Sequence, residues 1–176
     1  MICHTPFLVE AGSSSDSKIQ AAYSVISKSW GGGLHRFSTS DSPREKLTSL
    51  PKEKGIALLT GDPAEVNANG ESWLEAFGAW KKPLVLISIA SINGSVNGNS
   101  QAYVALCKEL SVPLLGIVQY GGEWDLALRR IDGLPWCGWI PDLNSEIAKL
   151  KSEDDLAESV DYIVSLLKIR LNLLNR

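Results

Sequence analysis

The chain has 176 residues, three cysteines and a formal net charge of -3, with acidic and basic residues interspersed. This length suits a single domain over residues 1–176, and the near balance of charge argues against nucleic acid or an anionic membrane surface as a partner. No apolar run approaches the roughly 20 residues that cross a bilayer, so we expect a cytoplasmic protein without a membrane segment. The scattered cysteines, without C-x-x-C spacing, predict neither a disulfide framework nor a zinc site.

Short apolar runs alternate with segments of helical period along the chain, which is typical of successive βα units in a parallel sheet. In chain order, strands are predicted at residues 7–11, 34–38, 55–60, 84–90, 113–118 and 136–140. Helices are predicted at 17–30, 65–80, 99–110, 123–132 and 152–174, with one helical turn near 44–49. The predicted fold is a three-layer α/β domain with a mostly parallel, six- to seven-stranded sheet.

The run LVLISIA at residues 84–90 is apolar at almost every position, which is typical of a central strand covered on both faces. In such sheets ligands bind at the carboxyl ends of the strands, because the loops diverge there and helix amino termini direct free N–H groups into one crevice. Three turns are therefore candidates for a ligand site: residues 12–18, 60–63 and 91–99.

The turn at residues 12–18 follows the first strand and opens the first helix, as a phosphate-binding loop of pattern G-x-x-x-x-G-K-[ST] does. Gly12 and Lys18 have the required spacing, but Ser17 replaces the second glycine and Ile19 replaces the hydroxyl that binds magnesium. Ser17 and Gln20 also form a capping box, which would start the helix without any ligand. The sequence leaves two interpretations open: an ordinary turn, or an anion site formed by backbone N–H groups, Lys18 and the hydroxyls of Ser13, Ser14 and Ser15.

Two stretches of the later half carry a family resemblance: KPLVLISIASINGSVNGNSQAYVALCKELSVPLLGIVQYG and, after it, LPWCGWIPD. They resemble the dethiobiotin synthetase family, within the P-loop group that includes the cobyrinic acid synthases and the MinD-type ATPases. The resemblance implies a P-loop NTPase-like fold and a homodimer with its substrate site near the two-fold interface. It also implies an ATP-dependent ligase of biotin biosynthesis, which closes a ring on a carbamate of 7,8-diaminopelargonate.

The resemblance also implies roles for individual residues. Lys18 would be the catalytic lysine of the phosphate loop, in which Gly12 and Asp16 are also retained. Gln119 and Pro141 match positions that hold adenine in the family. The turn that binds the substrate carboxylate through backbone N–H groups corresponds to Gly94, Ser95, Val96 and Asn97.

This sequence lacks residues that would bind magnesium at the positions where the family has them. Thr60 stands where the family has a glutamate after the third strand. Asp41 and Asp62 are weak alternative metal ligands, and each also suits a turn or a helix cap. The charge of a triphosphate would then be balanced only by Lys18, backbone dipoles and Arg36, so magnesium is not expected as a cofactor while ATP stays open as a ligand.

Three functions remain open, and we favour the first. It is a non-catalytic relative that binds a nucleotide or another small anionic ligand weakly; the second is an active ligase. The third is a protein-interaction domain that uses the apolar segment IVSLLKIRLNLLNR at residues 163–176. That segment predicts either part of a homodimer interface or a fully buried terminal helix. Three tryptophans near the proposed nucleotide end would stack on a base or fill a core or an interface: Trp124, Trp136 and Trp139.

Overall fold

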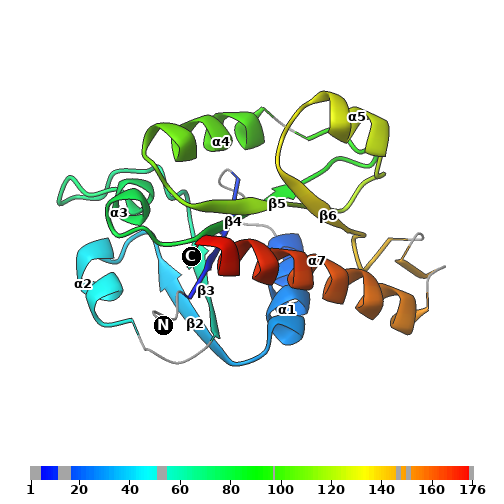
Figure 1. Ribbon diagram of the computed structural model, residues 1–176, viewed down its shortest axis with the longest axis horizontal. Helices are drawn as coiled ribbons and strands as arrows, with labels where there is room; N and C mark the ends of the chain where they lie inside the picture. Colours follow the sequence, from blue (N-terminus) through cyan, green and yellow to red (C-terminus); the bar gives the residue numbers. More distant parts are fainter. Residues whose placement is uncertain are drawn as a thin grey trace.

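The computed structural model describes residues 5–11, 17–50, 55–96, 98–145, 148–149 and 152–174. Within these ranges six strands form one sheet in which every pairing is parallel (Figure 1). In chain order they are β1 (Phe7–Glu10), β2 (Gly33–Ser38), β3 (Gly55–Thr60), β4 (Leu84–Ile89), β5 (Leu114–Tyr120) and β6 (Trp136–Ile140). The described helices are α1 (Ser17–Trp30), α2 (Pro43–Thr48), α3 (Trp73–Ala79), α4 (Asn99–Glu109), α5 (Leu126–Ile131) and α7 (Glu153–Leu174).

The strands are ordered β2-β3-β1-β4-β5-β6 across the sheet, so β1 lies in the middle although it comes first in the chain. Phe7 of β1 is level with Ala57 of β3 on one side and with Leu84 of β4 on the other. The prediction of a central β4 is confirmed, because β4 pairs with β1 and β5 and its residues 84–87 are fully buried. The buried side chains on both faces of β4 exclude water from its hydrogen bonds with β1 and β5.

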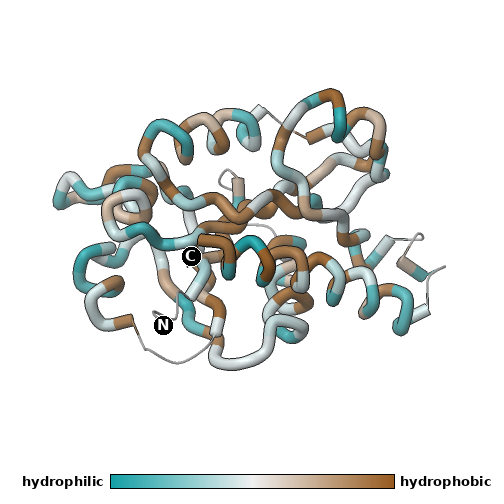
Figure 2. The backbone as a smooth tube through the Cα atoms, in the orientation of Figure 1, coloured by the Kyte–Doolittle hydropathy of each residue, from teal (hydrophilic) through white to brown (hydrophobic). Residues whose placement is uncertain are grey.

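Helices cover both faces of this sheet, which confirms the predicted three-layer architecture. On one face α1 and α7 pack together over an apolar core that includes Tyr23 and Leu167. On the other face α2, α3 and α4 cover a second core, where Phe7 lies against Trp73 and Phe77 with ring centroids 6.1 and 4.7 Å away. Figure 2 shows hydrophobic residues along the central strands and hydrophilic residues on the outer turns of the helices.

The helix predicted over residues 65–80 is wrong in its first half, because α3 begins only at Trp73. The preceding residues form a loop in which the Asn67 side chain accepts hydrogen bonds from the backbone of Asn69 and Glu71. Ser72 then caps the helix by accepting from the backbone N–H of Glu75. A capping signal, serine followed three residues later by glutamate, was present in the sequence at this point.

The terminal helix α7 is buried on one face only, so the prediction of a fully buried helix is wrong. Val160, Ile163 and Leu167 contact the core, whereas Tyr162 and Ile169 are 70% and 57% exposed. Among the described residues, no helix is both long enough and apolar enough to span a membrane.

Candidate functional site

A crevice of about 890 Å³ opens at the carboxyl ends of β4, β5 and β6. Its walls are the loops at residues 89–95 and 120–123, and its border is formed by Lys18, Asp142 and Ser145. The parallel strands bring these segments together, because their carboxyl ends share one edge of the sheet. We refer to this cavity as the crevice, and it adjoins the start of α1, where a phosphate loop would end.

Lys18 carries positive charge into the crevice. Its ammonium nitrogen Nζ lies 3.5 Å from Oδ2 of Asp142, the second residue after β6, and the two side chains are 47% and 17% exposed. A second cation lies near the same end of α1, where Arg36 donates from Nη1 to the Gln20 side-chain oxygen at 3.4 Å. Lysine and arginine are the side chains that most often bind phosphate groups in proteins.

Two glycines let the loops that wall the crevice interlock. Gly94 has φ +78°, and a Cβ there would lie 2.3 Å from the carbonyl oxygen of Glu123. Gly122 has φ +61°, and a Cβ there would lie 2.1 Å from the carbonyl oxygen of Ser91. Any larger residue at either position would strain the backbone and separate the loops. These contacts give the crevice a fixed wall.

The loop after β4 is held by its own polar groups. The backbone N–H of Ser91 donates to the carbonyl of Ser95 at 2.9 Å, and the two hydroxyl oxygens lie 2.6 Å apart. Asn93 accepts through Oδ1 from the backbone N–H of Ser95 at 3.1 Å. An antiparallel bridge joins Ala90 to Val96. The predicted carboxylate-binding turn therefore borders the crevice at Ser95, while Asn97 lies outside the described residues.

Gln119 is fully buried near the end of β5, and its side-chain amide forms hydrogen bonds within the chain. Nε2 donates to the carbonyls of Gly121 and Glu123 at 3.0 and 2.9 Å, and Oε1 accepts from Nε and Nη2 of Arg129 at 2.9 and 2.8 Å. The amide thus holds the crevice loop against the sheet. Its predicted role in binding adenine stays a prediction, as does that of Pro141, which is buried directly after β6.

Arg129 completes this network from α5. Its side chain also donates to the carbonyl of Gly94 and lies 3.6 Å from a carboxylate oxygen of Asp132. Its guanidinium carbon is 4.7 Å from the ring centroid of Trp136 and 5.9 Å from that of Trp124. A buried arginine with this many partners ties β5, α5 and both crevice loops together. No sequence motif marked it.

The carboxylates proposed as metal ligands have local partners. Asp62 accepts through Oδ1 from the Tyr103 hydroxyl and, at 2.9 Å, from the backbone N–H of Ala64. Burial, followed by the hydrogen bond to Asp62, raises the pKa of Tyr103 above its ordinary value. Asp41 accepts from the backbone N–H of Ser38 at 2.9 Å and lies 3.5 Å from the Lys46 ammonium. Both carboxylates stabilise loops, so their proposed metal role has no support in their contacts.

The two positions that correspond to magnesium ligands in the family, Thr60 and Ile19, do not offer a free oxygen ligand either. The Thr60 hydroxyl donates to the carbonyl of Phe37 at 3.1 Å, and Ile19, at the position of the magnesium hydroxyl, is a buried core residue. The described part of the chain contains no group of three or more His, Cys, Asp or Glu side chains that could hold a metal ion. The phosphate-loop residues Gly12, Ser13, Ser14, Ser15 and Asp16 lie outside the described residues, as does the side chain of Ser17.

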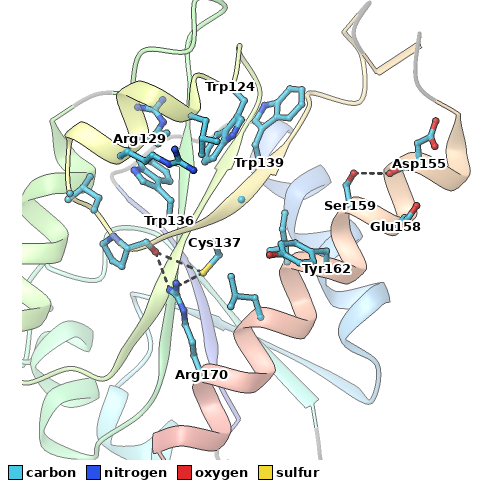
Figure 3. A pocket seen from close by; sticks show the side chains of 18 residues that line it. Trp124, Arg129, Trp136, Cys137, Trp139, Asp155, Glu158, Ser159, Tyr162 and Arg170 are labelled. Carbon is cyan, nitrogen blue, oxygen red and sulfur yellow. Dashed lines mark hydrogen bonds between the residues drawn. The ribbon is translucent and has the colours of Figure 1, made fainter.

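The three tryptophans lie outside the crevice. They line a groove of about 1070 Å³ at the outer edge of β6, between α5 and α7, which we call the edge groove (Figure 3). Trp124 and Trp136 meet edge to face with centroids 6.1 Å apart. Trp139 donates from Nε1 to the carbonyls of Gly121 and Gly122 at 3.1 and 3.0 Å. These contacts support the interpretation of the tryptophans as packing residues.

Sequence reasoning missed Asp142, although its position could have been found, whereas Ser91 begins the candidate turn at residues 91–99. Asp142 is a polar residue two positions after the end of a predicted strand, where ligands bind in parallel sheets. The ion pair between Asp142 and Lys18 had no sequence signal, because the two residues are distant in the chain and only the sheet brings them together.

No protein-family model and no curated protein matches this sequence significantly. Among solved structures, the fold is similar to that of a protein described as a plasmid partition protein of Borrelia burgdorferi, bound to AMPPNP. The likeness covers 95% of this chain and 99% of that chain, with 8% sequence identity and a TM-score of 0.56. An identity this low establishes the fold alone. The chain has a P-loop NTPase-like fold, with three layers and a six-stranded, all-parallel sheet within its described residues.

Proposed function

We propose that this protein is a P-loop NTPase-like relative that binds a nucleotide or another small anionic ligand in the crevice, without efficient turnover. The observation that carries this proposal is the position of Lys18 at the start of α1, with its ammonium at the mouth of a cavity of about 890 Å³. A cavity of this size accommodates a nucleotide. A cytoplasmic location remains part of the proposal.

Weak binding follows from the partner of Lys18. A phosphate group that approaches the ammonium must compete with Asp142, which already lies 3.5 Å away. The carboxylate also adds negative charge to the crevice and so repels the ligand. Because Lys18 is 47% exposed, solvent screens both effects, and the competition reduces affinity without abolishing it.

Poor turnover follows from the missing metal ligands. Phosphoryl transfer depends on groups that neutralise charge as it develops, and magnesium normally supplies much of this neutralisation. Here Ile19 lies in the core, and Asp62 is bonded to Tyr103 and Ala64. Lys18 is therefore proposed as a binding residue more than a catalytic one.

Two likenesses support a nucleotide as the ligand. The later half of the chain resembles the dethiobiotin synthetases, and the structural neighbour was solved with AMPPNP. An active dethiobiotin synthetase-type ligase is the alternative, and it requires a magnesium site that the contacts of Thr60, Asp41 and Asp62 do not favour.

The test is titration calorimetry with ATP, with and without magnesium, on the wild-type protein and on Lys18→Met. We expect weak binding that magnesium changes by less than about twofold and that Lys18→Met lowers about tenfold, as loss of a charge-assisted hydrogen bond predicts. Lys28→Met, an exposed lysine at the far end of α1, is the matched control and should bind ATP like the wild type.

A second assay separates the alternatives. Phosphate release is measured with ATP, magnesium, diaminopelargonate and bicarbonate, and we expect no release above the rate without protein. Magnesium-dependent micromolar binding with turnover would establish the ligase instead. If ATP, pyrophosphate and phosphate all fail to bind, the proposal is wrong and an interaction domain without a small ligand becomes the better explanation.

A further inference from the structure

The edge groove lies along the outer side of β6. Within the described sheet β6 pairs only with β5, so its other side is an edge of the sheet. The groove runs around this edge, with α5 on one side and α7 on the other. A strand edge that no other element covers is a common docking place for an extended segment of another protein. The groove therefore lies where a further strand would continue the sheet.

The groove has the length of a short peptide. Asp155 and Arg170 both line it, and α7 rises about 22 Å between them at 1.5 Å per residue. An extended chain spans about 3.3 Å per residue, so about six or seven residues would fill this length. The floor includes three half-buried apolar side chains, those of Trp124, Pro135 and Trp136. Aromatic side chains are enriched at the centres of protein interfaces.

Each wall of the groove presents one apolar and one charged side chain, four residues apart on its helix. Leu126 and Arg130 do so on α5, and Tyr162 and Glu158 do so on α7, where Figure 3 shows them one turn apart. All four are exposed, Leu126 by 50% and Tyr162 by 70%. Arg130, Glu158 and Tyr162 form no hydrogen bond or ion pair with the described part of the chain. These side chains are available to a partner.

The two walls lie on opposite faces of the sheet. Trp136 packs against the core that α3 and α4 cover, and its ring contacts Arg129 of α5. Ile163 of α7 belongs to the core on the other face, which α1 covers. Figure 1 shows the same arrangement, with α5 and α7 on either side of the strands. Since successive side chains of an extended chain point to opposite faces, neighbouring residues of a peptide beside β6 would reach different walls.

We propose that the edge groove binds an extended peptide segment of another protein, in which a basic residue and an acidic residue are neighbours in the sequence. The basic side chain pairs with Glu158 on α7, and the acidic side chain pairs with Arg130 on α5. Apolar side chains on either side of this charged pair contact Tyr162 and Leu126. Opposite charges on the two walls favour such a peptide over one with a single kind of charge, which one wall would repel. This binding is separate from that of a ligand in the crevice.

The test is selection of random nine-residue peptides, displayed on phage, against the wild-type protein, with Glu158→Lys as the counter-selection. The selected peptides should contain adjacent basic and acidic residues among apolar ones. Fluorescence anisotropy of the labelled peptides should give a micromolar Kd, which Glu158→Lys and Arg130→Glu each raise at least tenfold. Glu65→Lys is the matched control and should bind like the wild type, because Glu65 is exposed after β3 and three strands separate β3 from β6.

Changes in the selected peptide test its charge pairing and its extended conformation. A peptide with its two charges exchanged should bind the double variant of Glu158→Lys and Arg130→Glu more tightly than it binds the wild type. One threonine inserted between the charged residues places both on the same side of an extended chain, so the Kd should rise at least tenfold. Two inserted threonines restore the alternation and should restore binding. A peptide bound as a helix would not follow this period of two.

Three results would overturn the proposal. They are a selection that enriches no sequence, selected peptides that bind Glu158→Lys as tightly as the wild type, and peptide binding that weakens as the protein concentration rises. In the last case a second copy of the chain would occupy the groove. Calorimetry with ATP should give the same affinity for Glu158→Lys and the wild type, so a failure of peptide binding is distinguishable from a failure of nucleotide binding.

Discussion

Lys18 and Asp142 face each other at the mouth of the crevice, with Nζ and Oδ2 3.5 Å apart. The first follows the segment that resembles a phosphate loop, and the second lies in the loop after β6. The pair joins the start of α1 to the loop after β6 at the carboxyl ends of the strands. It also places a carboxylate where an anionic ligand would bind the lysine, so the ion pair and the ligand compete.

Replacing the carboxylate should therefore strengthen anion binding. We expect Asp142→Asn to tighten ATP binding three- to tenfold, which corresponds to about 1 kcal/mol, because the amide neither competes for the ammonium nor repels phosphate. Calorimetry with ATP at low ionic strength measures the change. The free energy of unfolding should shift by less than about 1 kcal/mol, since Lys18 is half exposed. Weaker ATP binding by this variant would show that Asp142 assists the ligand.

Arg129 should contribute more to stability than any exposed arginine of the chain. Arg129→Met leaves the buried Gln119 Oε1 and the carbonyl of Gly94 without their donor, and each loss costs about 1–3 kcal/mol. We expect urea unfolding to show a loss of about 2–4 kcal/mol. Arg130→Met, on the exposed side of the same helix, is the control and should change stability by less than about 0.5 kcal/mol. Equal effects of the two substitutions would contradict the buried network.

Asp62 and Tyr103 should behave as a structural pair. In a double-mutant cycle of Asp62→Asn and Tyr103→Phe, we expect a coupling energy of about 1–2 kcal/mol in urea unfolding, because the two side chains are hydrogen bonded. Neither substitution should change ATP affinity with or without magnesium. Loss of a magnesium effect on ATP binding in Asp62→Asn alone would instead identify Asp62 as a metal ligand.

Stability should fall above about pH 9 because of the buried Cys107. Burial raises the pKa of this thiol from 9.0 to about 12. The unfolded chain then ionises first, so the free energy of unfolding decreases as pH rises from 9 toward 12, by at most about 1.4 kcal/mol per pH unit from this group. Urea unfolding between pH 8 and pH 10.5 should show a shallower decrease for Cys107→Ala. Parallel profiles for the two proteins would contradict this assignment.

The order of the elements could be predicted from the sequence, because each strand is a short apolar run and each long helix has an apolar period. The start of α3 could not be predicted from that period. Val66 fits the apolar spacing of the helix that ends at Ala79, but it pairs with Ser72 in a loop instead. Asn67 and Gly70, with φ +76°, stabilise that loop locally, and such side-chain bonds compete with helix formation.

The candidate site was predicted only in part. The spacing of Gly12 and Lys18 indicated an anion loop, and the position of turns after strands indicated which segments would meet. The partners of Gln119 and Asp62 were not predictable, because hydrogen-bond partners distant in the chain depend on how the loops pack. The match to an adenine-binding position therefore gave no sign that Arg129 bonds the Gln119 amide.

The sequence by itself determined the fold class and the central position of β4, and it showed that the apolar Ile19 stands where the phosphate-loop pattern has a hydroxyl. These features follow from local composition and spacing. Only the tertiary structure decided that Lys18 meets Asp142, that the tryptophans line the edge groove and that Tyr162 and Ile169 of α7 stay exposed. The physical reason is that periodicity shows which residues are apolar. Which apolar and charged groups find partners depends on the arrangement of the sheet and helices.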